Sequence, residues 1–217
     1  MGKFSVIIPT IWRGTYLKSL LKNLYESEYV DEVILINNDK KNTPYDFEKH
    51  EKLTYIETRE NIFVNPAWNL GVQIARNQKI IIAQDDLLFN VNTLGKLMDT
   101  IDSSQYQLKD LGIMGMNYGN YFLDEDMNEI KIEEYLHAPA WACILIFDKS
   151  VWKPIPEQMK IWYGDDFIKA TARPTLQIRG LKVESKISTS VNQQDSWIST
   201  ILENDRIEWY KILGITN

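Results

Sequence analysis

The most constraining stretch of the chain is residues 79–86, Lys-Ile-Ile-Ile-Ala-Gln-Asp-Asp, an apolar run that ends in a glutamine and two adjacent carboxylates. Consecutive apolar residues without alternation, most of them β-branched, predict a strand that is buried on both faces. Asp85 and Asp86 then lie at its carboxyl end, where open α/β sheets bind ligands. Adjacent carboxylates repel each other, and either a divalent cation or a solvated turn offsets that repulsion. A ligand site and a simple Asp-Asp turn both fit this stretch.

Composition describes one ordinary α/β domain. The chain has 217 residues, 44% hydrophobic and 25% charged, enough to bury a sizeable core. A net charge of -6 and a pI near 5.1 argue against a nucleic-acid partner. The single cysteine, Cys143, excludes an intrachain disulfide and a cysteine-rich zinc site, and its apolar surroundings predict a buried thiol.

Targeting signals are not apparent in the sequence. No apolar run approaches the length of about 18 residues that spans a bilayer, and the N-terminus lacks the basic and apolar regions of a signal peptide. We therefore expect a cytoplasmic protein without a transmembrane segment.

Strand and helix patterns alternate in the first half of the chain. Strands are predicted at residues 4–9, 31–36, 53–56 and 79–83. Thr15 is the expected N-cap of a helix that carries Leu17, Leu20, Leu21 and Leu24. Asn65 is the expected N-cap of a second helix, with Pro66 at its first position. This alternation favours a mostly parallel sheet with right-handed crossovers.

The second half is less regular and predicts a mixed sheet. Strand candidates are residues 112–118, 129–133 and 142–147, followed by two short strands near Leu176 and Val183. Residues 161–167 indicate a loop that opens a helix, because acidic residues suit a first helical turn. Residues 195–213 have apolar side chains near helical spacing, which predicts an amphipathic helix that packs on the core. The expected fold class is α/β, a mixed and mostly parallel sheet flanked by helices.

Several segments, taken in order, resemble the family 2 glycosyltransferases of GT-A fold. They are residues 4–10 (Phe-Ser-Val-Ile-Ile-Pro-Thr), 31–38 (Asp-Glu-Val-Ile-Leu-Ile-Asn-Asn), Glu60-Asn61 with Asn69-Leu70-Gly71, and 83–86 (Ala-Gln-Asp-Asp). Residues 162–166, Trp-Tyr-Gly-Asp-Asp, are similar to the segment that carries the catalytic base in inverting members. The resemblance implies one GT-A domain, with a nucleotide-binding half (1–90), an acceptor-binding half (91–190) and a C-terminal helix (191–217).

The resemblance also implies a nucleotide-sugar donor. Members of the family surround the nucleoside with the ends of the first two strands, which here carry Pro9, Thr10, Arg13, Asn37 and Asn38, and with residues that match Arg59, Asn61 and Asn69. The family usually has Asp where this chain has Asn37, and an amide oxygen still accepts a hydrogen bond from N3–H of uracil or thymine. Arg13 or Arg59 is expected to pair with the diphosphate. The expected donor is a UDP-sugar or a dTDP-sugar.

Gln84-Asp85-Asp86 takes the place of the family's DxD signature. Asp86 is the expected ligand of Mn²⁺ or Mg²⁺, while Gln84 or Asp85 contacts the ribose or a metal-bound water. Family members often supply a late histidine ligand, and residues 183–190 contain none. Metal binding is therefore expected either to be weak and nucleotide-dependent or to rest on Asp86 and phosphate alone.

Asp166 and Asp165 are the expected catalytic residues. Asp166 matches the family base that removes the proton of an acceptor hydroxyl, and Asp165 binds acceptor or donor sugar, although these two roles could be exchanged. His137, Trp141 and Trp162 are expected to contact the acceptor or the sugar, since aromatic faces stack on sugar rings. A buried structural role is the competing interpretation for each of the three.

The resemblance implies that the chain transfers a hexosyl or deoxyhexosyl group to a hydroxyl of a glycan or another acceptor, with inversion. The alternative is a nucleotide- or carbohydrate-binding module of GT-A fold without turnover, which the departures at Asn37, Gln84 and the late histidine favour. A nucleotidyltransferase is disfavoured, because no Gly-rich loop with Lys or Arg follows the first strand.

Overall fold

The computed structural model describes residues 2–44, 49–104, 106–116, 129–135, 141–181, 183–185 and 196–215. Its strands are β1 (Phe4–Thr10), β2 (Val30–Asn37), β3 (Leu53–Glu57), β4 (Lys79–Ala83), β5 (Leu87–Phe89), β6 (Ile113–Met116), β7 (Lys131–Glu134), β8 (Ile144–Asp148), β9 (Thr175–Arg179) and β10 (Val183–Ser185). Its α-helices are α1 (Leu17–Glu26), α2 (Val64–Ile74), α3 (Thr93–Asp102), α4 (Gly164–Thr171) and α5 (Ser196–Ile212).

Eight of these strands form one sheet in the order β3-β2-β1-β4-β8-β6-β9-β7, and β10 pairs separately with β5. The pairs β1–β2, β1–β4, β2–β3 and β6–β9 are parallel. Strand β8 runs antiparallel to β4 and β6, and β7 runs antiparallel to β9. The predicted mixed and mostly parallel sheet is confirmed.

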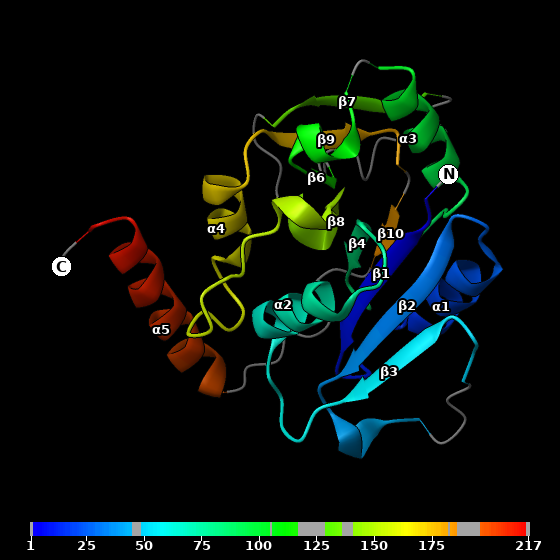
Figure 1. Ribbon diagram of the computed structural model, residues 1–217. Coiled ribbons are helices and arrows are strands. Elements are labelled where there is room, and N and C mark those ends of the chain that lie inside the picture. The colour runs from blue at the N-terminus through cyan, green and yellow to red at the C-terminus, as the bar shows by residue number, and fades with distance from the viewer. Residues whose placement is uncertain are drawn as a thin grey trace.

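Helices cover both faces of the sheet (Figure 1). One apolar cluster joins α1 and α3 to the face that carries Val6 and Ile8 of β1. A second joins α2 and α4 to the face that carries Ile7. Helix α2 lies close to β1, since a Cβ atom on Gly71 would stand 2.3 Å from a methyl carbon of Ile7. Strands β1 and β4 are buried on both sides, as their uninterrupted apolar runs predict.

Both predicted helix caps are wrong. Helix α1 begins at Leu17 with Tyr16, not Thr15, as its N-cap. Helix α2 begins at Val64 with Phe63 as its N-cap, so Asn65 is a helical residue. The side chain of Asn65 does not cap the helix, because it donates hydrogen bonds to the carbonyl oxygens of Met159 and Trp162, far along the chain.

Strand β5 and helix α3 were not predicted from the sequence. Strand β5 pairs with β10 through Leu87, Leu88 and Phe89, and α3 follows it. Other predicted strands shift slightly: residues 141–143 form a 3₁₀ turn, and β8 begins at Ile144.

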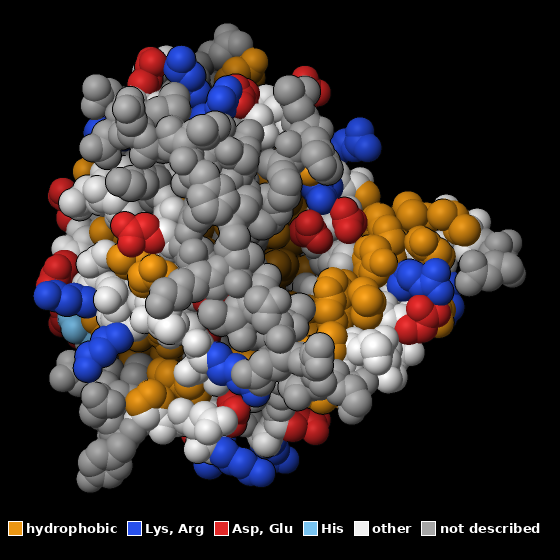
Figure 2. Space-filling model, turned by 180° about the vertical axis from the view of Figure 1, so that it is seen from behind, with side chains coloured by type: hydrophobic (Ala, Val, Ile, Leu, Met, Phe, Trp, Pro, Cys, Tyr) orange, Lys and Arg blue, Asp and Glu red, His pale blue; other side chains and the backbone are white. Residues whose placement is uncertain are grey.

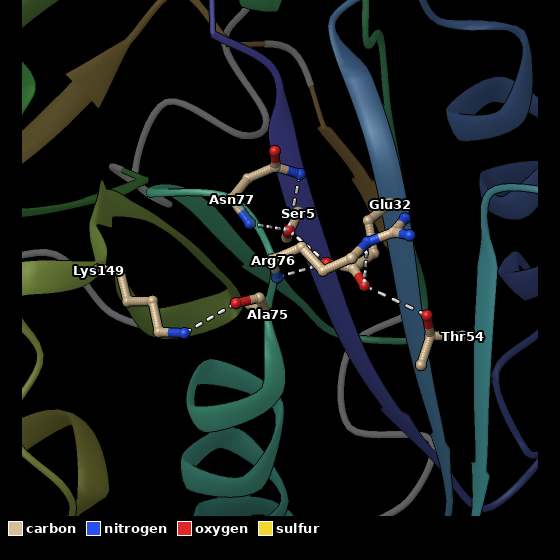
Figure 3. A network of polar contacts seen from close by, with 7 residues as sticks. All are labelled: Ser5, Glu32, Thr54, Ala75, Arg76, Asn77 and Lys149. Carbon is tan, nitrogen blue, oxygen red and sulfur yellow. Dashed lines mark hydrogen bonds and ion pairs between the residues drawn. The ribbon is translucent and has the colours of Figure 1, made fainter.

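A buried carboxylate ties together the amino ends of the central strands (Figure 3). Glu32 of β2 accepts hydrogen bonds from Ser5 Oγ at 2.6 Å, from the amide of Arg76 at 2.9 Å and from Thr54 Oγ1 at 3.2 Å. The Arg76 guanidinium lies 3.1 Å from the same carboxylate. This network stands at the edge of the sheet opposite the carboxyl ends of β1 and β4.

Helix α5 lies beside α4, at the side of the molecule away from α1 (Figure 1). It confirms the predicted C-terminal helix, but its apolar stripe is only partly covered. Hydrophobic side chains gather on the projecting side of the surface that carries this helix (Figure 2), and Trp197, Leu202, Ile212 and Leu213 are exposed. No helix within the described ranges combines the length and apolar character needed to cross a bilayer.

Candidate active site

A pocket of about 350 Å³ lies at the carboxyl ends of β1 and β4. This volume falls within the range typical of small-ligand sites, about 300–1,000 Å³. The predicted site residues that line it are Pro9, Thr10, Asn38, Asn61, Gln84, Asp85, Asp86, Trp162 and Asp165. Because β1 and β4 are adjacent and parallel, the residues that follow them meet at one edge of the sheet.

Asp85 and Asp86 form the acidic floor of this pocket, and both are buried. Thr10 Oγ1 donates to Asp85 Oδ2 at 2.6 Å, which joins the ends of β1 and β4. The pKa of Asp85 is raised to about 6, chiefly by burial and to a smaller extent by the charge of Asp86, against the opposing effect of the Thr10 hydrogen bond. A cation at this edge would offset the cost of two neighbouring buried charges.

The amide of Asn37 is saturated by internal hydrogen bonds. Its oxygen accepts from Trp12 Nε1 at 2.8 Å and from the amide of Asp39 at 2.9 Å. Its nitrogen donates to Thr43 Oγ1 and to Tyr55 Oη, each at 2.7 Å. An amide oxygen has two acceptor positions, so a nucleobase can bond to Asn37 only if one of these donors moves.

Asn38 and Asn61 stand on the side of the pocket where α2 begins. Asn38 Nδ2 donates to the carbonyl oxygen of Phe63 at 3.4 Å, and the amide of Phe63 donates to Asn61 Oδ1 at 2.8 Å. Phe63 has a φ of 67°, a conformation unusual for a bulky residue, and its ring lies against Trp197 of α5 with centroids 5.9 Å apart. Arg13 and Arg59 are outside the pocket lining, and Arg59 is exposed.

Only one member of the acidic pair at the start of α4 reaches the pocket. Asp165 lines the pocket, whereas Asp166 is outside its lining. Lys169 Nζ lies 3.2 Å from Asp165 Oδ2 and 3.0 Å from Asp166 Oδ1. Burial lowers the pKa of Lys169, but the nearby charges of Asp165 and Asp166 outweigh burial and raise it overall. Lys169 therefore holds the two carboxylates in fixed positions.

Two other predicted site residues, Trp141 and Asn69, lie outside the pocket lining. Trp141 is 0% exposed and donates its indole N–H to the carbonyl oxygen of Leu176 at 2.9 Å, so its ring fills the core and is not open to a sugar. Asn69 donates to the carbonyl oxygen of Ile155 at 2.7 Å and accepts from the Ile155 amide at 2.9 Å, outside the pocket. His137 lies outside the described residues.

The pocket also contains residues that were not predicted. They are Ile11, Phe63, Val64, Ala142, Cys143, Ile161, Trp197 and Ile198. Most are apolar, so no signal in the sequence separates them from core residues. Burial raises the pKa of the Cys143 thiol to about 12, which keeps it protonated at neutral pH.

The described residues fit a divalent cation only in part. Asp85 and Asp86 supply hard oxygen atoms of the kind that Mg²⁺ and Mn²⁺ prefer. No group of three or more His, Cys, Asp or Glu side chains that could hold a metal occurs in the described part of the chain. The donor set therefore suits a cation whose remaining ligands come from a bound diphosphate and water.

Comparison with solved structures gives the same architecture. S. aureus TarS 1–349 in complex with UDP is 19% identical with a TM-score of 0.60, and the match covers 81% of this chain and 57% of that chain. The complex of the same fragment with UDP-GlcNAc is 16% identical with a TM-score of 0.55, covering 81% and 55%. GalNAc-T7 with UDP, GalNAc and Mn²⁺ is 13% identical with a TM-score of 0.53, covering 85% and 43%. This chain therefore spans little more than half the length of the TarS fragment.

Comparison with curated protein sequences gives no match. The family profile for glycosyl transferase family 2 matches residues 5–150. That range includes β1, β4 and the acidic floor of the pocket. The chain belongs to glycosyl transferase family 2 and has the GT-A fold.

Proposed function

We propose that this chain transfers a sugar from a UDP-sugar or a dTDP-sugar to a hydroxyl group of a glycan or another acceptor, with inversion at the anomeric carbon. The observation that carries the proposal is one pocket that is lined both by the acidic pair Asp85-Asp86 and by a third carboxylate, Asp165 of α4. Such a pocket offers separate places for a diphosphate with its cation and for a base. Family membership and the UDP bound to TarS support the same donor class.

The part of the pocket that is lined by Thr10, Asn38 and Asp86 would hold the nucleotide. Thr10 ends β1 and Asn38 follows β2, and they would supply hydroxyl and amide groups for the nucleoside. Asp86, with Asp85 or Gln84 beside it, would hold Mn²⁺ or Mg²⁺ against the diphosphate, and such a cation neutralises the charge that develops on the leaving group. Trp162 offers an aromatic face to the sugar.

Asp165 is the better placed general base. The acceptor oxygen bonds to the anomeric carbon as the bond from that carbon to the diphosphate oxygen breaks, and the nucleoside diphosphate leaves with the electron pair. The proton of the acceptor hydroxyl must pass to a carboxylate at this point. Asp165 lines the pocket and Asp166 does not, so we assign the base to Asp165, although Lys169 pairs with both carboxylates.

A binding module without turnover is the second candidate, and the saturated amide of Asn37 favours it. Thermal unfolding with a panel of nucleotide sugars, with and without Mn²⁺, tests donor binding. A ligand at about 100 times its Kd should add roughly 2.7 kcal/mol of stability. Release of the nucleoside diphosphate by the stabilising donor then separates an enzyme from a module. Equal stabilisation by GDP and UDP would contradict the proposed donor class.

A further inference from the structure

Three successive backbone amides in the segment before α4 converge on one carboxylate of α5. The amide of Lys160 donates to Asp205 Oδ1 at 2.8 Å. The amides of Ile161 and Trp162 donate to Asp205 Oδ2 at 2.8 Å and 2.9 Å. Consecutive N–H groups that point to one place form an anion-binding concavity, and here a side chain of the same chain occupies it.

Asp205 lies where helix packing alone would favour an apolar residue. It is 0% exposed, in the middle of α5, on the face that carries Ile198 and Trp209. A buried carboxylate is tolerated only when hydrogen bonds replace its lost hydration. The three hydrogen bonds from backbone N–H groups replace that hydration, and they join α5 to a segment more than forty residues earlier in the chain.

The same segment is held from its other side by α2. Asn65 Nδ2 donates to the carbonyl oxygens of Met159 at 3.2 Å and Trp162 at 3.4 Å. The amide of Asn65 donates to the carbonyl oxygen of Lys160 at 3.1 Å. A Cβ atom on Gly164 would stand 2.2 Å from Asn65 Oδ1, so only glycine fits at the start of α4. The segment is therefore fixed between α2 and α5.

What the segment positions is one wall of the pocket. Ile161 and Trp162 line the pocket, and Asp165 follows one turn later. Tyr163 between them has a left-handed φ of 59°, and its ring stacks on Trp209 of α5 with centroids 6.5 Å apart. A backbone in this conformation persists only where its surroundings determine it.

We infer that Asp205 is a positioning residue for the transfer reaction: its carboxylate holds residues 160–162 so that Trp162 and Asp165 face the bound donor. This inference rests on the proposed function. Asp205 is buried and outside the pocket lining, so it acts through residues 160–162 and not on the substrate itself. The acidic floor of the pocket is joined to β1 by a different contact, the hydrogen bond from Thr10 to Asp85.

Asp205→Asn tests the inference. The asparagine side chain has one acceptor oxygen where the carboxylate has two, and its NH₂ group cannot accept a hydrogen bond from the backbone N–H groups of residues 160–162. Glu203→Gln is the matched control, since Glu203 is an exposed carboxylate on the same helix that pairs with Arg206. We expect Asp205→Asn to lower kcat for donor hydrolysis at least tenfold. The Kd of UDP, measured by calorimetry with Mn²⁺, should stay within threefold of the wild-type value, and Glu203→Gln should match wild type in both.

Hydrogen exchange supplies a readout that does not depend on turnover. The amides of residues 160–162 should exchange at least tenfold faster in Asp205→Asn, while those of β1 and β4 stay unchanged. Wild-type kcat in Asp205→Asn, or loss of kcat with an equal loss of UDP affinity, would overturn the positioning role. A wild-type chain without hydrolysis of any donor would instead refute the proposed function, and this inference with it.

Asp205→Glu serves if Asp205→Asn does not fold. Its carboxylate still accepts hydrogen bonds but stands one methylene further from α5, so it displaces residues 160–162. We expect kcat to fall at least fivefold at an unchanged Kd for UDP. Equal kcat in Asp205→Glu and the wild type would overturn the inference.

Discussion

The indole N–H of Trp12 donates a hydrogen bond of 2.8 Å to the side-chain oxygen of Asn37. This is the same kind of donor that the N3–H of uracil or thymine would offer to that oxygen. Trp12 has a left-handed φ of 63°, and its amide donates to Thr10 Oγ1 at 2.8 Å. A pyrimidine base that bonds to Asn37 must therefore displace Trp12 or the amide of Asp39.

Trp12→Phe should strengthen UDP binding. The substitution removes the indole donor and leaves one acceptor position on Asn37 for the base, so we expect the Kd to fall about three- to tenfold, the scale of one net hydrogen bond. Trp152→Phe is the control, because its indole donates to Asn69 at 3.3 Å outside the pocket. Calorimetry of both variants with UDP measures the effect. An unchanged or higher Kd in Trp12→Phe would show that the base does not use Asn37.

Asp86→Ala should abolish most of the Mn²⁺ dependence of UDP binding. Asp86 lines the pocket beside Asp85, and its loss removes a hard oxygen ligand from a donor set that is already small. We expect affinity with Mn²⁺ to fall at least tenfold, to about the value measured in EDTA. Asp99→Ala, which removes an exposed carboxylate of α3, is the control. If Mn²⁺ still strengthens UDP binding in Asp86→Ala as in the wild type, Asp86 is not the ligand.

Glu32→Gln should destabilise the fold without touching the site. The amide replaces a buried carboxylate that accepts from Ser5, Thr54 and Arg76, so we expect the free energy of unfolding to fall by about 2–4 kcal/mol. The comparison is Glu57→Gln, because Glu57 forms an ion pair with Lys40 near the surface and should change stability by less than about 1 kcal/mol. Urea denaturation measures both. Equal effects of the two substitutions would contradict the role of Glu32.

Cys143 should be inert in the native protein. Burial raises the pKa of its thiol to about 12, whereas the pKa of a cysteine in an unfolded chain is about 8.5. Above that lower pH the unfolded chain loses its proton first, so the stability that Cys143 contributes declines as pH rises toward 12. At pH 8 a disulfide reagent should label the native protein far more slowly than the protein in guanidinium, and Cys143→Ala should show no labelling. Complete labelling of the native chain within minutes would contradict this.

The sequence predicted what depends on local pattern. The strands that end near Thr10, Asn37 and Gln84 have continuous apolar runs, and parallel strands bring their ends to one edge, so much of the pocket lining followed from residue order. Helix α3 was not predicted, although Leu94, Leu97, Met98 and Ile101 have helical spacing. The Gly and Asp residues among them are also typical of turns.

The contacts that were not predicted depend on which way a side chain points, or they join residues that are far apart in the chain. Whether Trp141 faces a ligand or the core is decided by the close approach of Gly115, where a Cβ atom would stand 2.3 Å from the indole. Which of Asp165 and Asp166 lines the pocket depends on the rotation of α4, which neighbouring acidic residues do not reveal. Asp205 meets residues 160–162 across more than forty residues, and no motif links them.

Release of UDP or dTDP from a panel of nucleotide sugars in the presence of Mn²⁺, with water and then sugars as acceptor, is the direct test of glycosyl transfer in this pocket. We expect the wild-type chain to turn over at least one UDP- or dTDP-sugar. Asp165→Asn should lower kcat about 10²-fold or more, the scale of a lost general base, with the Kd of UDP nearly unchanged, while Asp166→Asn should lose less. Full turnover in Asp165→Asn, or a wild-type chain that binds UDP and releases no product from any donor, would contradict glycosyl transfer with Asp165 as the base.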